Sequence, residues 1–265
     1  MSSIKVTHAD SGLVLTTVAA SRHVSPHIVR VTLGGGDLDR FAFTGFDQWF
    51  RLAIPVHASD RFDNLPARFG VGGLVKYLTL SKGTRPVIRN YTVRQYRSDP
   101  AEIDIDFVMH GDKGIASPWA ASVKPGAKAA FIDQGHGWAP VDADQVLIVA
   151  DESGMAAALG ILRDLPRDTV GDAIIEIFDE CDEQEHEAPE GVNVQWLVRD
   201  PSEAPGTLAL PALRALPPCT SLYAFAVGES ALATGTRRYL VNELGLPRAN
   251  VTFCGYWRIG RSSPS

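Results

Sequence analysis

Arg89-Asn90-Tyr91-Thr92-Val93-Arg94 is the most informative stretch of the sequence. Pro86 and Val87 lead into it, and its β-branched and aromatic residues are typical of a strand. Two arginines flank an aromatic ring and a small hydroxyl, a set that suits a flat, phosphate-bearing ligand such as a flavin nucleotide. A solvated strand with its arginine and threonine side chains outward explains the same pattern.

Strand geometry limits how this stretch can meet one ligand. Alternation places Arg89 and Tyr91 on one face, and Thr92 and Arg94 on the other. A flat ligand cannot easily contact both faces of the middle of a strand. If all four side chains bind it, the ligand lies across a strand end or a bulge.

The composition is that of a globular protein long enough for two domains. The chain has 265 residues, of which 45% are hydrophobic and 21% are charged, so each domain can bury its own core. The net charge of −6 gives no overall basic field. We therefore expect no nucleic-acid partner, and an anionic ligand has to rely on local cations.

Several kinds of site find no support in the sequence. Cys181, Cys219 and Cys254 do not have the spacing of a zinc or iron–sulfur site, and the histidines form no His-x-x-x-His or Glu-x-x-His pair on a predicted helix, so we expect no bound metal. The Gly-x-Ser-x-Gly motif of serine hydrolases is absent. Without a signal peptide or a membrane-spanning apolar run, the expectation is a cytoplasmic monomer.

Residues 12 to 135 show short β-rich segments separated by turns, which is typical of an antiparallel barrel or sandwich. One short helix is expected near Ser117-Pro118, where serine suits the N-cap and proline the first turn. Residues 60–73 are expected to form a long loop. Strands are predicted at residues 13–19, 27–33, 48–54, 77–80, 87–96, 103–109 and 128–132.

After Pro140 the pattern changes to strands that alternate with helices, which predicts a parallel sheet with covered faces. The domain boundary falls near residues 138–144, giving domains at 1–140 and 141–265. Strands are predicted at residues 145–150, 173–178, 192–198, 222–227 and 250–256, and helices at 153–165, 207–216 and 230–244.

Two turns are candidates for phosphate binding. The segment from His110 to Trp119 follows a strand and opens the short helix, and glycines beside a helix start favour anions, although a plain turn explains the segment taken alone. Ala150-Asp151-Glu152-Ser153-Gly154 is not a Gly-x-Gly-x-x-Gly fingerprint. A helix start at the carboxyl end of a parallel strand still suits a nicotinamide nucleotide, while an N-cap role explains Ser153 equally well. Gly228-Glu229-Ser230 repeats this arrangement, with the same two explanations.

The acidic run at residues 179–187 is either a solvated loop or a border of the nucleotide site. Beside the adenosine ribose its charge disfavours a 2′-phosphate and favours NADH, unless Arg199, Arg237 or Arg238 offsets it.

Four stretches together resemble the siderophore-interacting proteins, flavin-dependent ferric-siderophore reductases with a ferredoxin-reductase-like fold. Arg89 to Arg94 is similar to the family's Arg-x-Tyr-Thr-x-Arg flavin motif, and His110 to Ala120 to its His-Gly-x-x-Gly-Pro-Ala-x-x-Trp-Ala segment. Ala150 to Ala157 corresponds to Gly-Asp-Glu-Thr-Ala-Leu-Pro-Ala, and Gly255 to Gly260 to the Gly-Tyr-Trp-Arg-x-Gly ending. The resemblance covers nearly the whole chain.

The resemblance implies an antiparallel, six-stranded-type FAD-binding β-barrel followed by an α/β domain with a parallel sheet that binds NADPH or NADH. It places Arg89 and Arg94 near phosphate or flavin, Tyr91 on the ring system and Thr92 near its reactive edge. The backbone from Gly114 to Ser117 would hold the pyrophosphate. The other implied cofactor-binding residues are Val93, Asp106, Val108, His110, Ile115, Ala116, Trp119, Asp151, Glu152, Ser153, Gly154 and Trp257.

The implied activity is reduction of Fe(III) in a ferric siderophore by NAD(P)H through FAD, with Arg51, Lys76 and Arg258 as cations for the chelate. Arg51 stands where the family usually has lysine, Ile115 replaces proline, and residues 150 and 153–156 depart from the pattern. Since most departures fall at the expected nucleotide site, FAD is better supported than the electron donor. A general flavin reductase with another acceptor and a non-catalytic ferric-siderophore carrier are the alternatives.

Overall fold

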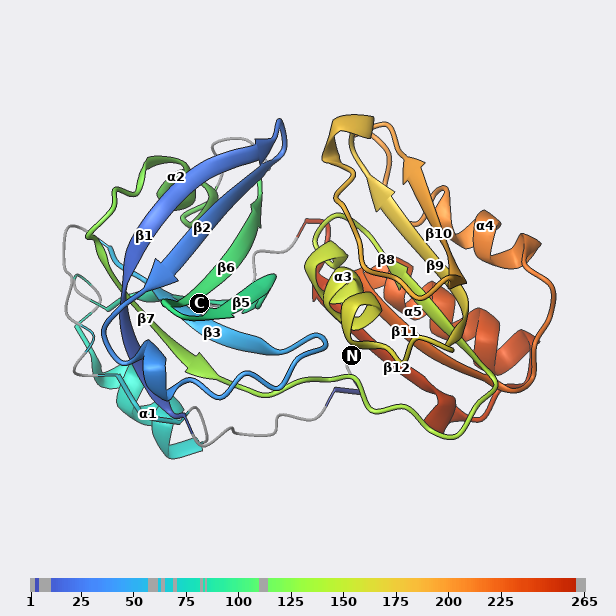
Figure 1. The fold of residues 1–265 in the computed structure, drawn as a ribbon, viewed down its shortest axis with the longest axis horizontal. Helices are drawn as coiled ribbons and strands as arrows, with labels where there is room; N and C mark the ends of the chain where they lie inside the picture. Colours follow the sequence, from blue (N-terminus) through green and yellow to red (C-terminus); the bar gives the residue numbers. More distant parts are fainter. Residues whose placement is uncertain are drawn as a thin grey trace. The chain divides into compact units, whose positions relative to one another are not determined.

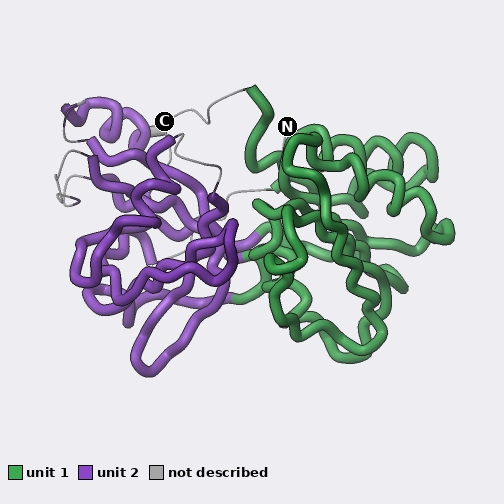
Figure 2. Tube along the Cα trace, turned by 90° about the horizontal axis from the view of Figure 1, so that it is seen from above, with its two compact units in different colours: residues 1–5, 45–47, 137–264 green, residues 6–44, 48–136, 265 purple. Residues whose placement is uncertain are grey.

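The computed structural model describes residues 3–4, 11–56, 62, 65–68, 71–81, 83, 85–109 and 114–260. The chain forms two compact units, drawn in Figure 1 and coloured separately in Figure 2. The barrel unit contains the described residues of 6–44 and 48–136. The α/β unit contains those of 1–5, 45–47 and 137–264.

The barrel unit is a seven-stranded antiparallel sheet, which confirms the predicted barrel. Its spatial order is β4-β3-β7-β1-β2-β6-β5. The strands are β1 (Leu13–Ser25), β2 (Ile28–Gly34), β3 (Trp49–Ile54), β4 (Val87–Thr92), β5 (Gln95–Ser98), β6 (Ala101–Val108) and β7 (Lys128–Asp133).

The sheet closes at the stretch from Arg89 to Arg94. β4 and β5 are the two ends of the strand order, yet only Val93 and Arg94 separate them in the chain. The Val93 N–H donates to the Gln48 carbonyl beside β3 at 2.8 Å, and the Arg94 N–H donates to the Asp104 carbonyl of β6 at 2.9 Å. The predicted single strand at 87–96 is therefore two strands, because the chain has to change edge there.

Alternate residues of these strands fill the inside of the barrel. In β2, Val29, Val31 and Leu33 are fully buried, while Arg30 and Thr32 between them point outward. The same alternation runs through β6. Polar side chains of these two strands therefore share the outer face, where Arg30 pairs with Asp106.

The predicted strand at residues 77–80 is wrong, because these residues lie in or just after helix α1 (Val71–Thr79). Tyr77 is buried beside Phe62 and Leu65, and its hydroxyl donates to the Pro86 carbonyl at 2.9 Å. The neighbouring Leu78 is 53% exposed. A short apolar run fits either element, and here the buried tyrosine anchors a helix.

The remaining short helices of the barrel unit are η1 (Leu38–Arg40) and α2 (Ala116–Ser122). The predicted helix near Ser117 is confirmed, but it begins two residues earlier than expected. Ile115 occupies the N-cap position. Ser117 is therefore not the cap, and its hydroxyl donates to the Val108 carbonyl of β6 at 3.1 Å.

The predicted parallel sheet of the α/β unit is confirmed, and its five strands lie in the order β10-β9-β8-β11-β12. Its strands are β8 (Gln145–Ala150), β9 (Val170–Ile177), β10 (Gly191–Val198), β11 (Leu222–Glu229) and β12 (Val251–Trp257). Its helices are α3 (Met155–Asp164), η2 (Glu180–Asp182), α4 (Ala209–Ala215), α5 (Ser230–Arg238), η3 (Tyr239–Glu243) and η4 (Arg248–Asn250). None of the described helices is long and apolar enough to cross a membrane.

The strand order of this unit reverses between β8 and β11. Chain order runs outward from β8 through β9 to β10, then restarts on the other side with β11 and β12. Open parallel sheets bind ligands outside the carboxyl ends of their strands at such a switch point. The turns after β8 and β11 are therefore the expected nucleotide site.

Two segments that come early in the chain pack within the α/β unit. Ser3 exchanges hydrogen bonds with Phe253 and so covers the outer edge of β12. The Phe46 N–H donates to Asp164 Oδ2 at 2.5 Å, and the Asp47 carboxylate accepts from the Trp138 N–H at 2.8 Å.

Candidate functional site

Tyr91 is the second-last residue of β4 and packs against the barrel core. It lies opposite Phe50 of β3, and its ring centroid is 4.3 Å from that of Phe107. Burial raises the pKa of the Tyr91 hydroxyl. Arg89 lies on the same face, opposite Leu52. The ring is therefore a fixed, neutral surface at the rim of the core.

Thr92 is the final residue of β4, so the strand end required by the side-chain alternation is present. Thr92 lies opposite Trp49, on the other face from Tyr91, and is 8% exposed. The next residue, Val93, is buried in the barrel core. Because the pleat stops at Thr92, neighbouring side chains there are no longer held to opposite faces.

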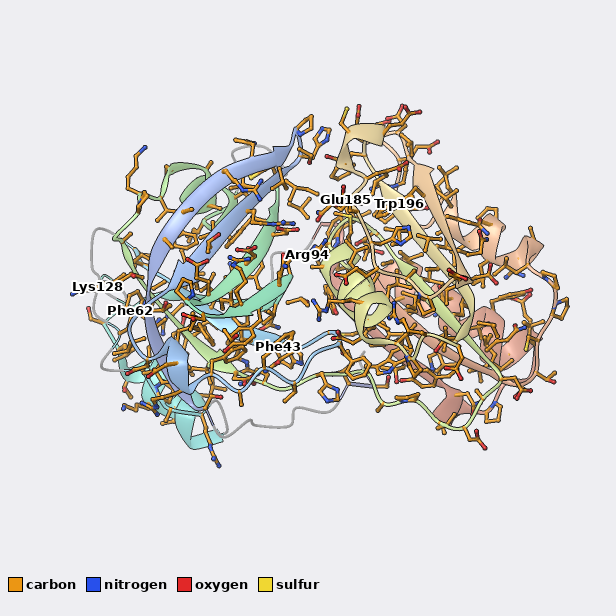
Figure 3. All side chains as sticks on the ribbon, viewed as in Figure 1. Phe43, Phe62, Arg94, Lys128, Glu185 and Trp196 are labelled. Carbon is orange, nitrogen blue, oxygen red and sulfur yellow. The ribbon has the colours of Figure 1, made fainter. Side chains whose placement is uncertain are left out.

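Arg94, Arg30 and Asp106 form a charged group on the outer face of β2 and β6, and Figure 3 labels Arg94. Arg30 pairs with both oxygens of Asp106, at 2.7 and 2.8 Å. The Arg94 Nε lies 3.8 Å from the same carboxylate. Two cations share one anion, so the group carries a net positive charge, which suits a phosphate.

The start of α2 leaves room for a ligand against its backbone. Gly114 has a φ of +107°, and a Cβ built there would meet no atom of the described residues within 4 Å. Ile115 is 42% exposed, and Ala116 and Trp119 pack against the barrel core. His110 lies outside the described residues.

This set of groups fits FAD. A neutral aromatic ring and a hydroxyl occupy adjacent positions at a strand end, an arginine-rich group lies on the outer face, and a glycine precedes a helix. Tyr91 suits the ring system of FAD, Thr92 suits its polar edge, and the arginine group and the start of α2 suit its pyrophosphate. Contact of the individual residues with FAD stays a prediction.

Asp151 holds the switch point of the α/β unit together. Its Oδ1 accepts hydrogen bonds from Ser153 N at 2.9 Å and Ser153 Oγ at 2.5 Å, and its Oδ2 accepts from Glu229 N at 2.6 Å. A Cβ on Gly228 would lie 2.6 Å from this carboxylate. Asp151 therefore ties the turn after β8 to the turn after β11, and burial raises its pKa.

Glu152 is the second buried acid of this turn. Its Oε2 lies 2.9 Å from Nη2 of Arg199, and its Oε1 has no hydrogen-bond partner. Burial and the neighbouring Asp151 charge raise the pKa of Glu152 to about 8. Both predicted acids are thus engaged inside the protein, and the half-buried Ser153 donates its N–H and its hydroxyl to Asp151.

The turn after β11 positions the C-terminal ending of the chain. Ser230 Oγ donates to the Trp257 carbonyl at 2.8 Å, and Glu229 accepts from the Ile259 N–H at 3.2 Å. A Cβ on Gly255 would lie 2.4 Å from Ser230 Oγ. Trp257 is thereby fixed at the carboxyl end of β12, the sheet edge at which ligands bind.

The three cations predicted to bind the chelate come from different elements. Arg51 of β3 lies opposite Asn90 of β4, and burial lowers its pKa. Lys76 is exposed on α1, and its Nζ lies 3.5 Å from the Leu65 carbonyl. Arg258 is exposed after β12 in the α/β unit. Their contact with a substrate stays a prediction.

Sequence analysis missed several residues that shape these sites. Gln48 is fully buried, and its Nε2 donates to the carboxylate of Asp133 at 3.1 Å while its main-chain carbonyl holds Val93. Arg30 pairs with Asp106. Glu229 belongs to the predicted Gly228-Glu229-Ser230 turn, but its hydrogen bond to the chain after Trp257 was not predicted. No local motif marks these roles, because each residue acts on a partner 30 or more residues away.

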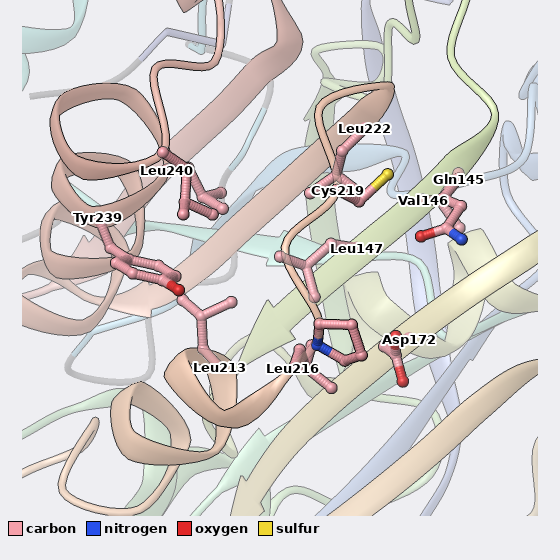
Figure 4. Close-up of a pocket in the computed structure, with 12 residues that line it drawn as sticks. Gln145, Val146, Leu147, Asp172, Leu213, Leu216, Cys219, Leu222, Tyr239 and Leu240 are labelled. Atoms are coloured by element: carbon pink, nitrogen blue, oxygen red, sulfur yellow. The ribbon is translucent and has the colours of Figure 1, made fainter.

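A small cavity in the α/β unit lies at the opposite edge of the sheet from the switch point (Figure 4). Gln145 and Leu222 in its lining are the first residues of β8 and β11. Its volume of about 30 Å³ has room for one water molecule. Among the described residues no group of three His, Cys, Asp or Glu side chains could hold a metal ion.

Comparisons with known proteins agree with this architecture. A family model described as a siderophore-interacting FAD-binding domain matches residues 17–137, and one described as siderophore-interacting protein matches residues 143–260. The ferric vibriobactin reductase ViuB of Vibrio cholerae is 33% identical, over 91% of this chain and 88% of the relative. The NADPH-dependent ferric-chelate reductase of Escherichia coli is 29% identical, over 91% of both chains.

A solved structure of a siderophore utilization protein from T. fusca covers 98% of both chains at 32% identity, with a TM-score of 0.78. The fold and the order of the two units agree with those of this relative. The chain belongs to the siderophore-interacting protein family, and its first half is a FAD-binding domain.

Proposed function

We propose that the protein is an FAD-dependent reductase that uses NADPH or NADH to reduce Fe(III) in a ferric siderophore and release it as Fe(II). FAD, when bound, accepts a hydride from the nucleotide and passes single electrons to the chelated iron, and hard-oxygen chelators hold Fe(II) far less tightly than Fe(III). The chain itself supplies binding, orientation and charge.

One observation carries the proposal: the barrel closes at the flavin motif. The change of edge at Val93 and Arg94 ends β4 at Thr92 and brings Arg94 beside Asp106 and Arg30. The proposed roles follow from this arrangement. Tyr91 supports the ring system, Thr92 lies near its reactive edge, and Arg89 and Arg94 meet phosphate or flavin. Val93, Asp106, Val108 and the segment from Gly114 to Trp119 complete the cofactor site.

The nucleotide is proposed to bind at the switch point, where Asp151 and Glu152 shape the turn that presents Ser153 and Gly154, with Trp257 at the same edge. Residues 1–140 would form the FAD-binding domain and residues 141–265 the nucleotide-binding domain. Arg51, Lys76 and Arg258 are proposed to attract the anionic chelate. The protein is further proposed to act as a monomer in the cytoplasm, where NAD(P)H is supplied.

The first test is an absorbance spectrum of the purified protein before and after addition of FAD. It is followed by anaerobic oxidation of NADH or NADPH with a ferric siderophore and a coloured Fe(II) chelator. We expect a yellow protein and Fe(II) formation that depends on all three components. A protein that stays colourless after FAD addition would exclude the flavin assignment.

The same assay separates the two alternatives. Equal rates with a ferric siderophore and with free flavin or other acceptors would indicate a general flavin reductase. Quenching of tryptophan fluorescence by a ferric siderophore without any Fe(II) formation would indicate a carrier.

A further inference from the structure

The end of β9 leads into a part of the chain without cations. β9 is the second strand of the α/β unit, and in nucleotide-binding sheets the end of the second strand is where the adenosine ribose is recognised. No lysine or arginine occurs between Arg167 and Arg199. The exposed acids after β9 are Asp179, Glu180, Glu183, Glu185 and Glu187.

Arg199, at the end of the neighbouring strand β10, cannot offset this charge. Its side chain is only 2% exposed, and it forms ion pairs with Glu152 at 2.9 Å and Glu176 at 3.2 Å. Its Nη1 donates to the Glu203 carbonyl at 2.5 Å. The guanidinium is therefore committed to the interior and presents no charge to a ligand.

The arginines of the helices lie at the wrong edge of the sheet. Each helix of a βαβ unit runs back from the carboxyl edge to the amino edge, so its last turn lies far from the nucleotide site. Arg163, Arg214 and Arg237 occupy such last turns, where they contact Asp164, Glu243 and the ring of Phe253, and Arg238 follows Arg237.

Among the described residues, the remaining cations of the α/β unit do not approach the carboxyl end of β9. Arg167 donates to the Leu165 carbonyl before β9 and to the Glu187 carbonyl in the segment that leads to the start of β10, and Arg248 precedes β12, so both lie at the amino edge. Arg261 lies outside the described residues. Arg258 follows β12, which is three strands from β9, or about 14 Å at ~4.8 Å per strand. No lysine occurs after Lys128.

We infer that the nucleotide site of this chain rejects a 2′-phosphate, so that NADH is its electron donor. This inference rests on the proposed function. A 2′-phosphate needs an arginine or a lysine at the ribose, whereas carboxylates there accept hydrogen bonds from the free 2′-hydroxyl and repel a phosphate. The chain would thus differ from the Escherichia coli relative, whose name states that it is NADPH-dependent.

The test compares the two nucleotides on the FAD-loaded, full-length protein. Calorimetric titration with NAD⁺ and NADP⁺ measures binding without turnover, and anaerobic stopped-flow measures bleaching of the flavin by NADH and by NADPH. We expect NAD⁺ to bind at least tenfold more tightly, and NADH to reduce the flavin with at least tenfold higher kcat/KM. Equal or better binding and reduction with the phosphorylated nucleotides, or reduction by neither, would overturn the inference.

A charge reversal next to β9 checks where the discrimination arises. Glu180→Arg places a cation at the exposed end of β9 and should narrow the preference for NADH at least fivefold. Glu190→Arg makes the same change in net charge at an exposed position before β10, at the amino edge, and should leave the preference unchanged. Equal responses of the two variants would contradict the proposed location.

Failure of the proposed function would appear separately. In that case the protein reduced with dithionite would not form Fe(II) from a ferric siderophore, whichever nucleotide it prefers. The preference between NAD⁺ and NADP⁺ in the titrations does not depend on that step.

Discussion

The carboxylate of Glu229 accepts a hydrogen bond from the backbone N–H of Ile259 at 3.2 Å. Its other oxygen accepts from the Ala231 N–H and so caps α5. One buried side chain therefore fixes both the start of α5 and the segment of the chain that follows Trp257.

Glu229→Gln should release one of these two contacts, because an amide offers only one acceptor oxygen. We expect the free energy of unfolding to fall by about 1–2 kcal/mol. Hydrogen exchange at the Ile259 amide should become faster. Asp200→Asn is the control, since its Oδ1 accepts from Ser202 and can still do so as an amide. Unchanged exchange at Ile259 would show that Glu229 does not hold this segment.

Gly255→Ala should be destabilising because the added Cβ would lie 2.4 Å from Ser230 Oγ and 2.9 Å from Ser230 Cα. We expect a loss of about 1–3 kcal/mol in urea unfolding. Gly72→Ala is the matched control in α1, where nothing lies within 4 Å of the new Cβ. The free energy of unfolding of Gly72→Ala should be unchanged or higher than that of the wild type by up to about 1 kcal/mol. Similar losses in both variants would contradict the steric explanation.

Ionisation of Glu152 should make stability depend on pH. Its folded pKa of about 8 lies above its ordinary value of 4.5, so the folded protein holds a proton that the unfolded chain releases. The stabilisation from this proton is complete below about pH 4.5 and is lost as the pH rises to about 8. The free energy of unfolding should therefore fall between pH 5 and 8, by up to about 1.4 kcal/mol per pH unit.

Glu152→Gln should make this slope shallower, since glutamine cannot ionise but can still accept from Arg199. Urea unfolding at pH 5.5, 6.5 and 7.5 measures the slope. Glu243→Gln is the control, because Glu243 is exposed and its partner Arg214 lowers its pKa, so it titrates below this range. Parallel pH profiles for wild type and Glu152→Gln would refute the assignment.

Arg51→Ala should raise KM for strongly anionic ferric chelates, such as catecholates, more than for hydroxamates, if Arg51 attracts the substrate. We expect a three- to tenfold increase in KM with a smaller change in kcat. Arg40→Ala removes an exposed cation of the same unit near Asp37 and should leave both constants unchanged. An unchanged KM in Arg51→Ala would remove this residue from the substrate site.

Local pattern was enough for much of the fold. β8 occupies the predicted residues 145–150, because a short apolar run that is bounded by turn residues and followed by a predicted helix is typical of a buried strand. α1 was missed because the run from Tyr77 to Leu80 is apolar in either conformation. The break at Val93 and Arg94 was missed because it depends on Gln48 and Asp104, which no local pattern connects to the motif.

The same limit applies to the sites. The motif residues were selected because a ring, a hydroxyl and two cations close together in the chain suit a flavin, and their contact with FAD stays a prediction. The distribution of charge was not, since the burial of Arg199 with Glu152 and Glu176 follows from the packing of three strands. Only the structure shows that this arginine is unavailable to a nucleotide.

Arg94→Ala provides the sharpest test of the flavin site, because a second arginine nearby serves as its control. The Arg94 Nε lies 3.8 Å from Asp106, whose two oxygens also pair with Arg30, and Arg94 is proposed to contact a phosphate of FAD. Loss of one charge-assisted contact of about 1.5–3 kcal/mol should weaken FAD binding roughly 10- to 100-fold in equilibrium dialysis. Arg97→Ala, whose guanidinium is paired with Asp104 at 2.8 and 2.9 Å and with Glu102 at 3.0 Å, should retain FAD as wild type does. Equal FAD affinity in both variants would mean that the cofactor's phosphates lie elsewhere on the barrel.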